Sequence, residues 1–420
     1  MRAPEDAALT AGGSRVPRWL LPAGVQPSAL FLLVGRGLRG FCDGFIAVLL
    51  PAYLLALGFG ELDVGLVSST TLIGSALATI AVGMLGNRYA PRRMLTFAAG
   101  LMAVTGIGFA GLSALWPLLI VAFVGTLNPS SGDVSLFLPI EQARLAESAM
   151  GDARTAVFAR YSLIGALSAA VGALVAALPD WLASHTAMSL LAGMRAMFVL
   201  YALTGVALWL LYLHLPRPSA TTRAPSAPLG PSRGIVTRLA LLFSVDAFAG
   251  GLVVNALLSL WLMQRFGLSL GAAGRFFFWA GLLSAGSQLV AVPLSRKIGL
   301  LNTMVFTHIP ASLCLIAAAF TPSLPLTLAL LLIRSALSQM DVPTRTAYVM
   351  AVVTPPERPA AASFTTVPRS LAAALGPTLA GALIALGWAG APLLACGVLK
   401  ITYDLSLLGA FRHVKEKPDG

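Results

Sequence analysis

The chain has 420 residues, of which 57% are apolar and only 10% are charged, and its mean hydropathy is +0.85. Average soluble domains carry roughly 25% charged residues, so this composition excludes an ordinary water-soluble protein. The net charge of +12 does not indicate nucleic-acid binding, because no polar stretch is long enough to fold into a basic soluble face.

The chain starts with a polar, proline-containing segment, 1–28, which we expect to be a retained cytoplasmic tail. The apolar stretch that follows is longer than a signal-peptide core of about 7–15 residues. Twelve apolar stretches are each long enough to cross a bilayer. We expect these spans at 29–57, 62–86, 93–113, 116–139, 154–178, 188–214, 235–264, 271–295, 301–321, 324–350, 360–386 and 391–412. The sequence therefore predicts an all-α integral membrane protein with twelve transmembrane helices.

Residues 216–234 are rich in Pro, Ser and Arg, which is typical of a flexible linker. This linker separates an N-terminal six-helix bundle, 29–215, from a C-terminal six-helix bundle, 235–412, and a short tail at 413–420 follows. Most of the 28 Lys and Arg residues fall in the linker, the termini and the loops of one side. The positive-inside rule places that side in the cytoplasm. We expect both termini to be cytoplasmic and the protein to lie in a plasma membrane, specifically a bacterial inner membrane.

The two bundles are similar to each other at an offset of about 208 residues. The residues S-G-D-V at 131–134, which end the fourth span, match Q-M-D-V at 339–342, which end the tenth. Arg160 in the fifth span matches Arg369 in the eleventh. Duplicated parallel halves are a transporter architecture, in which the substrate binds between the halves near the middle of the membrane.

The loop after the second span contains the most specific motif of the chain. The residues G-M-L-G-N-R-Y-A-P-R-R at 83–93 resemble the signature loop of the major facilitator superfamily, G-x-x-x-D-R-x-G-R-R. A degenerate copy, P-L-S-R-K-I-G at 293–299, follows the eighth span. The resemblance implies the fold of that superfamily, with two pseudo-symmetric six-helix bundles.

The resemblance also implies a cytoplasmic gate. In the superfamily, basic residues of the motif pair with an acid at the inner end of span four, and the motif's own acid caps span eleven in the outward-facing state. We therefore expect Arg92 or Arg93 to pair with Asp133, and Arg296 or Lys297 to pair with Asp341, within a set of gate residues that comprises Gly83, Asn87, Arg88, Arg92, Arg93, Asp133, Arg160, Arg296, Lys297, Asp341 and Arg369.

Two positions depart from the superfamily motif, because Asn87 replaces its acid and Ala90 replaces its second Gly. An Asn side chain still accepts a capping hydrogen bond but brings no charge to the helix dipole, so the gate should be weaker. The alternative is that the basic loop serves only as a topology signal.

The resemblance to drug exporters of the superfamily is partial. Asp43, followed by Pro51 in the first span, is similar to the acidic start of one exporter motif. The Gly-Pro pair of the antiporter motif occurs in the eleventh span, as Gly376-Pro377, instead of the fifth. Export is therefore one of the functions that remain open.

Charged residues inside spans cost at least about 2.5–3.5 kcal/mol each on insertion scales, so each is a candidate functional residue. The first span places Arg36, Arg39 and Asp43 on one helical face, one and two turns apart. We expect Asp43 to bind substrate or a coupling proton, with a static ion pair as the alternative.

The other intramembrane charges lie in later spans. Asp246 in the seventh span is the approximate positional counterpart of Asp43 but lies nearer the cytoplasmic end, and it has either a substrate role or a structural or gating role. Arg334 should face a cavity, whereas Arg195 faces either a cavity or the outer surface. Lys400 and Asp404 are one turn apart and should pair with each other. The uncharged candidates for binding substrate or bridging helices are Asn128, Asn255, Gln288 and Gln339.

The sequence gives no indication of an enzyme, a metal or a cofactor. The chain contains no Walker-type loop, so ATP hydrolysis is not the energy source. Its four histidines, His185, His214, His308 and His413, are widely separated in the sequence and form no metal-binding motif.

The sequence therefore predicts a secondary active transporter of a small organic solute that works by alternating access, is coupled to protons and exports its substrate. The alternatives are an uptake permease for an organic anion and a non-transporting membrane sensor or scaffold. The arginines of the spans favour an organic anion, whereas the two acids favour a lipophilic cation. We expect a monomer in the bilayer whose partners are a small molecule and protons, without nucleic acid.

Overall fold

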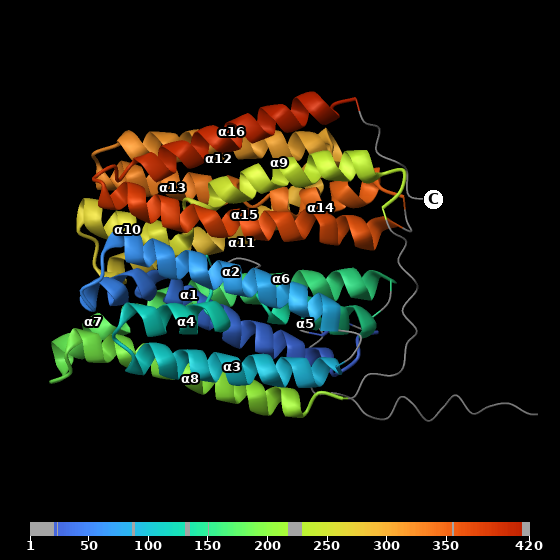
Figure 1. Ribbon diagram of the computed structural model, residues 1–420. Coiled ribbons are helices and arrows are strands. Elements are labelled where there is room, and N and C mark those ends of the chain that lie inside the picture. Colours follow the sequence, from blue (N-terminus) through green and yellow to red (C-terminus); the bar gives the residue numbers. More distant parts are fainter. Residues whose placement is uncertain are drawn as a thin grey trace, which may run out of the picture.

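The computed structural model describes residues 21–22, 24–85, 89–130, 135–149, 151–216, 229–354 and 357–413. Within these ranges the chain forms sixteen α-helices and no strand. The helices lie side by side along one common direction, and the two halves form separate layers, with the N-terminal half below the C-terminal half in Figure 1. The architecture is all-α, as predicted.

The N-terminal half contains eight helices: α1 Ala29–Ala56, α2 Glu61–Leu85, α3 Pro91–Gly111, α4 Leu115–Val124, α5 Phe137–Glu147, α6 Gly151–Val175, α7 Leu178–His185 and α8 Leu190–Leu213. The C-terminal half contains eight more: α9 Arg233–Gly251, α10 Asn255–Phe266, α11 Leu270–Ile298, α12 Leu300–Phe320, α13 Leu324–Leu337, α14 Asp341–Val352, α15 Arg358–Ala385 and α16 Ala391–Phe411. Most of the linker, 217–228, and most of the two tails, 1–20 and 414–420, lie outside the described residues.

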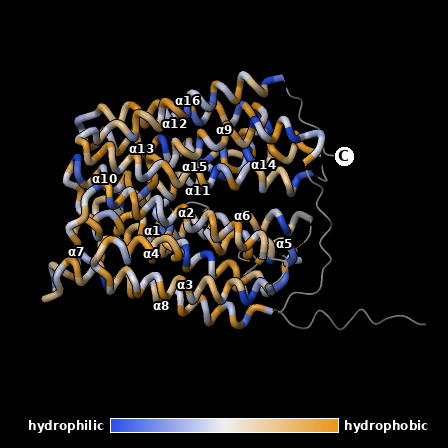
Figure 2. Tube along the Cα trace, in the orientation of Figure 1, coloured by the Kyte–Doolittle hydropathy of each residue, from blue (hydrophilic) through white to orange (hydrophobic). Residues whose placement is uncertain are grey.

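The length and composition of these helices fit a bilayer. The described residues include eleven stretches that are long and apolar enough to cross a membrane, and α4 is a shorter apolar helix in the position of the predicted fourth span. Large apolar side chains such as Phe97 and Trp116 are exposed on the outside of the bundle, and Figure 2 shows hydrophobic residues along most of the length of the helices. Lipid tails can cover such a surface, because its side chains are apolar and each helix satisfies its own backbone hydrogen bonds.

Three predicted spans are not single helices, which corrects their expected continuity. The fourth span is divided into α4 and α5, the seventh into α9 and α10, and the tenth into α13 and α14. Breaking residues explain one of these interruptions: α4 ends before Gly125, which is extended, and Pro129, which follows it, has no N–H to continue a helix. Non-helical backbone at membrane depth is tolerated only where it is buried in protein or lines a cavity.

Small residues allow the helices within each half to approach closely. A Cβ atom added to Gly44 of α1 would lie 1.9 Å from the carbonyl oxygen of Ala169 in α6. In the other half, a Cβ added to Gly251 of α9 would lie 2.2 Å from the carbonyl oxygen of Ala373 in α15. These contacts between the first and fifth spans of each half are equivalent, which supports the predicted duplication.

The two halves pack against each other at the end of the bundle that carries α7 and α10 (Figure 1). Helices α2 and α15 meet there, and the backbone N–H of Thr378 donates to the Ser69 hydroxyl at 2.9 Å. Helices α6 and α11 also meet, since a Cβ on Gly274 would lie 2.3 Å from the Ala173 carbonyl oxygen. This end of the interface between the halves is therefore tightly packed.

Candidate substrate-binding cavity

A cavity of about 810 Å³ lies between the two halves. Helices α1 and α6 line it on the N-terminal side, and α10, α11, α13 and α14 line it on the C-terminal side. Its lining reaches Thr155 near the start of α6 and Met350 near the end of α14. The cavity therefore runs from the packed end toward the end where the linker joins the halves.

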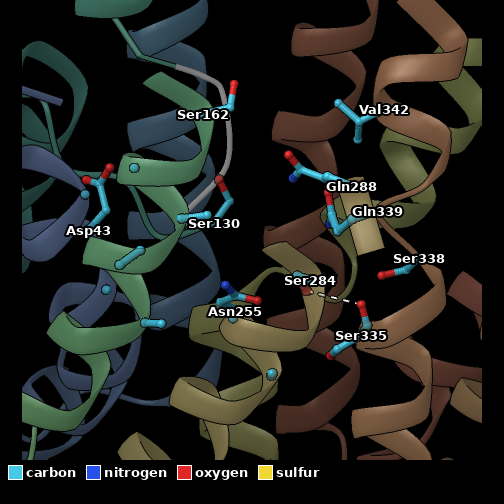
Figure 3. Close-up of a pocket in the computed structure, with 18 of the residues that line it drawn as sticks. Asp43, Ser130, Ser162, Asn255, Ser284, Gln288, Ser335, Ser338, Gln339 and Val342 are labelled. Atoms are coloured by element: carbon cyan, nitrogen blue, oxygen red, sulfur yellow. Dashed lines mark hydrogen bonds between the residues drawn. The ribbon is translucent and has the colours of Figure 1, made fainter. Parts of the chain in front are cut away.

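The interrupted spans supply much of the polar lining. Ser130 follows the break after α4, Asn255 begins α10, and Gln339 lies between α13 and α14. Figure 3 shows polar side chains on both walls, with Asp43, Ser130 and Ser162 from the N-terminal half facing Asn255, Ser284, Gln288, Ser335, Ser338 and Gln339 from the C-terminal half. The interrupted spans thus add hydrogen-bonding groups to those that the continuous helices α1, α6 and α11 supply.

Four of the eight predicted substrate or coupling residues line this cavity: Arg36, Asp43, Asn255 and Arg334. Gln288 and Gln339 also line it. The side chain of Arg334 forms no ion pair with any carboxylate of the described residues. Arg334 is therefore a cation that faces the cavity without an acidic neighbour.

The other four predicted residues lie outside the cavity lining. Arg195 donates to the Ser113 hydroxyl at 2.7 Å, in the connection between α3 and α4. Arg39, Asn128 and Asp246 are buried within their own halves. Arg195 was predicted to face either a cavity or the outer surface, and the structure does not support the cavity.

A buried cluster surrounds Glu141, which is completely inaccessible to solvent. Its carboxylate pairs with Arg39 and accepts hydrogen bonds from the hydroxyls of Tyr161 and Tyr212. The guanidinium of Arg39 also lies 4.4 Å from the ring centroid of Phe137. The sequence does not single out Glu141, because this residue follows the predicted fourth span. In the structure, α5 continues beyond that span and places Glu141 inside the bundle.

Asp43 lies beside this cluster in the cavity wall. It is within electrostatic range of Arg36 and Arg39, and it is within hydrogen-bonding reach of the Asn128 side chain. The Arg36 guanidinium lies 5.3 Å from the ring centroid of Tyr161. The predicted association of Asp43 with the two arginines of α1 is therefore present.

The C-terminal half contains an equivalent ion pair with the charges reversed. Asp246 of α9 pairs with Arg345 of α14 at 3.0 Å and with Lys400 at 2.6 Å. In the N-terminal half the arginine is on the first span and the acid is at the end of the fourth; here the acid is on the first span and the arginine is at the end of the fourth. Both halves thus join their first span to the end of their fourth span by a buried ion pair, with opposite polarity in the two halves.

Lys400 and Asp404 do not pair with each other, so that prediction was wrong. His308 of α12 lies between them, with Nδ1 at 3.1 Å from Asp404 Oδ1 and Nε2 at 3.2 Å from Lys400 Nζ. Lys400 pairs instead with Asp246. These partners come from three different helices, so no local spacing in the sequence could identify them.

The predicted gate residues are only partly described. Asn87, Arg88 and Asp133 lie outside the described residues. Gly83 lies in the last turns of α2, Arg92 and Arg93 begin α3, and Arg160 donates to the carbonyl of Ala156 in its own helix. The other members of the set that the structure describes are Arg296, Lys297, Asp341 and Arg369.

The second predicted gate pair is not formed in this structure. Asp341 is buried and pairs with Arg345 at 3.3 Å, one turn along α14. Arg296 and Lys297, its predicted partners, are exposed at the end of α11. A local partner within the same helix is closer at hand than one on a neighbouring helix, which explains the difference.

A comparison with family models identifies the class of protein. The model described as Major Facilitator Superfamily matches residues 32–333 and 239–419. The chain therefore belongs to this superfamily, and it is a membrane transporter, not an enzyme.

The chain is also similar to individual proteins. It is 23% identical over 416 residues to an uncharacterised membrane protein of Saccharomyces cerevisiae, YJR124C, across 90% of this chain and 93% of the relative. The nucleoside transporter NupG has the same fold, with a TM-score of 0.72 and 14% identity over 92% of this chain and 100% of its own. A bacterial homologue of the human lysosomal transporter Spinster, in an inward-facing and occupied conformation, gives a TM-score of 0.73 and 16% identity over 93% and 98%.

Proposed function

We propose that the protein is a secondary active transporter that carries a small organic anion by alternating access. The observation that carries this proposal is Arg334, whose side chain lines the cavity from α13 without an ion pair to any described carboxylate. A guanidinium in a membrane-embedded cavity is strongly stabilised by an anion, and its planar donors suit a carboxylate or phosphate.

The rest of the cavity favours an anion that also carries polar groups. Arg36 supplies a second guanidinium on the opposite wall, and the amides of Asn255, Gln288 and Gln339 supply hydrogen-bond donors and acceptors. The cavity volume of about 810 Å³ lies within the range of about 300–1,000 Å³ that is usual for sites of small molecules. These features support a substrate that has one anionic group and several hydrogen-bonding groups.

We propose that Asp43 couples transport to protons. An ionised Asp43 neutralises the neighbouring Arg36, whereas a protonated Asp43 leaves the guanidinium available for a substrate anion. A proton and an anion then bind together, which is the linkage that a proton–anion symporter requires. Of the two predicted directions, this linkage favours uptake over export.

The orientation and gate of the transporter belong to the same proposal. The excess of Lys and Arg near the linker supports a cytoplasmic location for that end of the bundle, and the cavity runs toward it. In the opposite state, closure of this end would bring Arg92 or Arg93 to Asp133. We propose a monomer in a plasma membrane, because each half-bundle is completed within one chain.

The test is the thermal stability of the detergent-purified protein with a panel of probes: lactate, succinate and benzoate as anions, and tetraphenylphosphonium as a lipophilic cation. A ligand at about 100 times its Kd stabilises the folded state by about 2.7 kcal/mol. We expect an anion to raise the melting temperature of the wild type and of Arg195→Gln, but not of Arg334→Gln. Arg195→Gln is the matched control, because that arginine lies outside the cavity. Stabilisation by the cation alone, lost in Asp43→Asn, would overturn the proposal.

A further inference from the structure

A second group of titratable side chains is buried inside the C-terminal half, away from the cavity. His308 of α12 is 4% exposed and Asp404 of α16 is completely buried. Neither residue lines the cavity, and neither do their neighbours Lys400 and Asp246. The anion site described above therefore does not use this group.

The contacts of His308 determine which of its nitrogen atoms carries hydrogen. The Lys400 ammonium lies 3.2 Å from Nε2, and an ammonium can only donate, so Nε2 must accept. The hydrogen of a neutral imidazole is then on Nδ1, which donates to Asp404 Oδ1 at 3.1 Å. The geometry defines a neutral His308 in its Nδ1–H form while Lys400 is in place.

Asp404 is incompletely satisfied in this arrangement. Its Oδ1 accepts the hydrogen bond from His308, but its Oδ2 is buried and has no hydrogen-bond partner among the residues that the structure describes. A buried carboxylate oxygen without a partner is energetically costly. With His308 neutral, the pair of His308 and Asp404 carries one full negative charge, and binding one proton would make the pair neutral overall.

Several helices contribute charged groups to the surroundings of His308, whereas the charged residues of α11, which also packs against α12, are exposed. Helix α9 supplies Asp246, whose Oδ1 lies 3.9 Å from Nε2, and α16 supplies the ring of Tyr403 at 6.3 Å. The other charged and titratable groups near His308 come from several helices. Helix α16 supplies Lys400, Tyr403 and Asp404, and α14 supplies Asp341 and Arg345. Arg369 of α15 acts on Asp246, and Arg334 of α13 faces the cavity.

We propose that His308 and Asp404 form a proton-binding site, and that Lys400 leaves His308 when the proton binds. A proton on Nε2 converts this nitrogen from an acceptor into a donor, so imidazolium and ammonium repel each other. Lys400 already contacts Asp246 at 2.6 Å and retains that partner. Proton binding thus removes one of the two side-chain links between α16 and α12, the contact of Lys400 with His308. The link between His308 and Asp404 and the pair of Lys400 with Asp246 remain.

This site differs from Asp43 in position and in consequence. Asp43 lies in the cavity wall of the N-terminal half, whereas His308 and Asp404 lie inside the C-terminal half. Protonation of the pair of His308 and Asp404 breaks the contact of Lys400 in the last span with His308. This consequence does not depend on whether the substrate is an anion. An experiment can therefore refute the proton site at His308 and Asp404 without refuting the anion site at Arg334, and the reverse is also possible.

The test is nitrogen NMR of the full-length protein in lipid nanodiscs, with ¹⁵N-labelled histidine and without any added solute. The chain has four histidines, and His308→Asn assigns the buried one. We expect the Nδ1–H form of His308 before acidification and the imidazolium form after it. A neutral Nε2–H form, or a spectrum that acidification does not change, would by itself overturn the proposal.

Substitutions test the role of Lys400. Lys400→Met should raise the midpoint of His308 protonation by at least about one pH unit, a tenfold gain in proton affinity, because a positive charge next to Nε2 is removed. Lys400→Arg keeps the charge and should stay near the wild-type midpoint, and so should Lys297→Met, a control at an exposed lysine. Asp404→Asn should lower the midpoint. A midpoint in Lys400→Met equal to that of the wild type would contradict the proposed movement.

Discussion

At the scale of single residues, buried ion pairs compensate the charges that lie within the membrane. Glu141 has three donors, from Arg39, Tyr161 and Tyr212, and no exposed surface. Breaking a buried pair leaves its partner as an uncompensated charge, whereas an exposed pair contributes little. The same α5 helix offers both cases, because Glu147 forms an exposed pair with Arg144.

We expect Glu141→Gln to destabilise the fold by about 3–5 kcal/mol, because it removes the carboxylate that pairs directly with the buried Arg39. The matched control, Glu147→Gln, should change the stability by no more than about 1 kcal/mol. Unfolding in detergent with increasing denaturant measures both variants. Equal effects of the two substitutions would show that the Glu141 cluster is not an energetic centre of the N-terminal half.

The sequence predicts individual charged positions better than their partners. Asp43, Arg36 and Arg334 were identified because a charge in an apolar stretch is conspicuous, and all three line the cavity. The partners of Arg39 and Asp246 lie about a hundred residues away in the chain, so only the packing of the helices reveals them. Hydropathy also hid Glu141, since a polar segment after a span resembles a loop.

At the scale of elements, contacts between helices hold the two halves together at one end. A Cβ atom on Gly65 of α2 would lie 2.4 Å from the carbonyl oxygen of Pro377 in α15, and backbone cannot yield as a flexible side chain can. Gly100 of α3, in contrast, has no atom within 4 Å of such a Cβ. The two glycines therefore separate the effect of the interface from the effect of adding a side chain to a membrane helix.

We expect Gly65→Leu to destabilise the described conformation by about 1–3 kcal/mol, because the larger side chain forces α2 and α15 apart. Gly100→Leu should leave it nearly unchanged. The melting temperature in detergent reports the stability, and the distance between spin labels on α2 and α15 reports the separation. An unchanged separation in Gly65→Leu would refute the assignment of this contact as a closed end.

The start of α9 is joined to the start of α15 through Glu357, outside the membrane spans. Hydrogen bonds from the Thr354 hydroxyl, Ser232 and the Gly230 backbone N–H hold the pKa of Glu357 at about 2, below its ordinary value of 4.5. A lowered pKa means that the ionised carboxylate stabilises the fold above about pH 4.5, and that this contribution is lost as the pH falls toward 2.

We therefore expect Glu357→Gln to lower the melting temperature near pH 7, and the difference from the wild type to shrink near pH 3. Glu147→Gln, which alters an exposed carboxylate, controls for the general effect of acid. Thermal unfolding at the two pH values measures the difference. A difference that is the same at both values would mean that the charge of Glu357 does not stabilise this junction.

Transmembrane helices could be predicted where the sequence contains a long apolar stretch. The all-α architecture and the positions of the spans follow from the apolar stretches alone. The breaks within the fourth, seventh and tenth spans do not, because an average over about 20 residues conceals a few non-helical ones. Those breaks supply Ser130, Asn255 and Gln339 to the cavity, so the least predictable backbone forms part of the candidate site.

At the scale of the whole molecule, two similar halves meet tightly at one end (Figure 1). They enclose a cavity whose lining runs toward the other end. Alternating access requires the contacts of α2 with α15 and of α6 with α11 to open while the linker end closes. The halves carry buried ion pairs of opposite polarity at equivalent positions. Each half can therefore move as a unit whose internal charges stay compensated.

We propose that an organic anion and a proton cross the membrane together through this cavity. The most direct measurement is proton entry into proteoliposomes that contain a pH-sensitive dye, after addition of lactate, succinate or benzoate under an inward proton gradient. We expect anion-dependent proton entry in the wild type and in Arg195→Gln, and its loss in Arg334→Gln and in Asp43→Asn. Anion-dependent proton entry that persists in Arg334→Gln, or proton movement driven only by tetraphenylphosphonium, would contradict it.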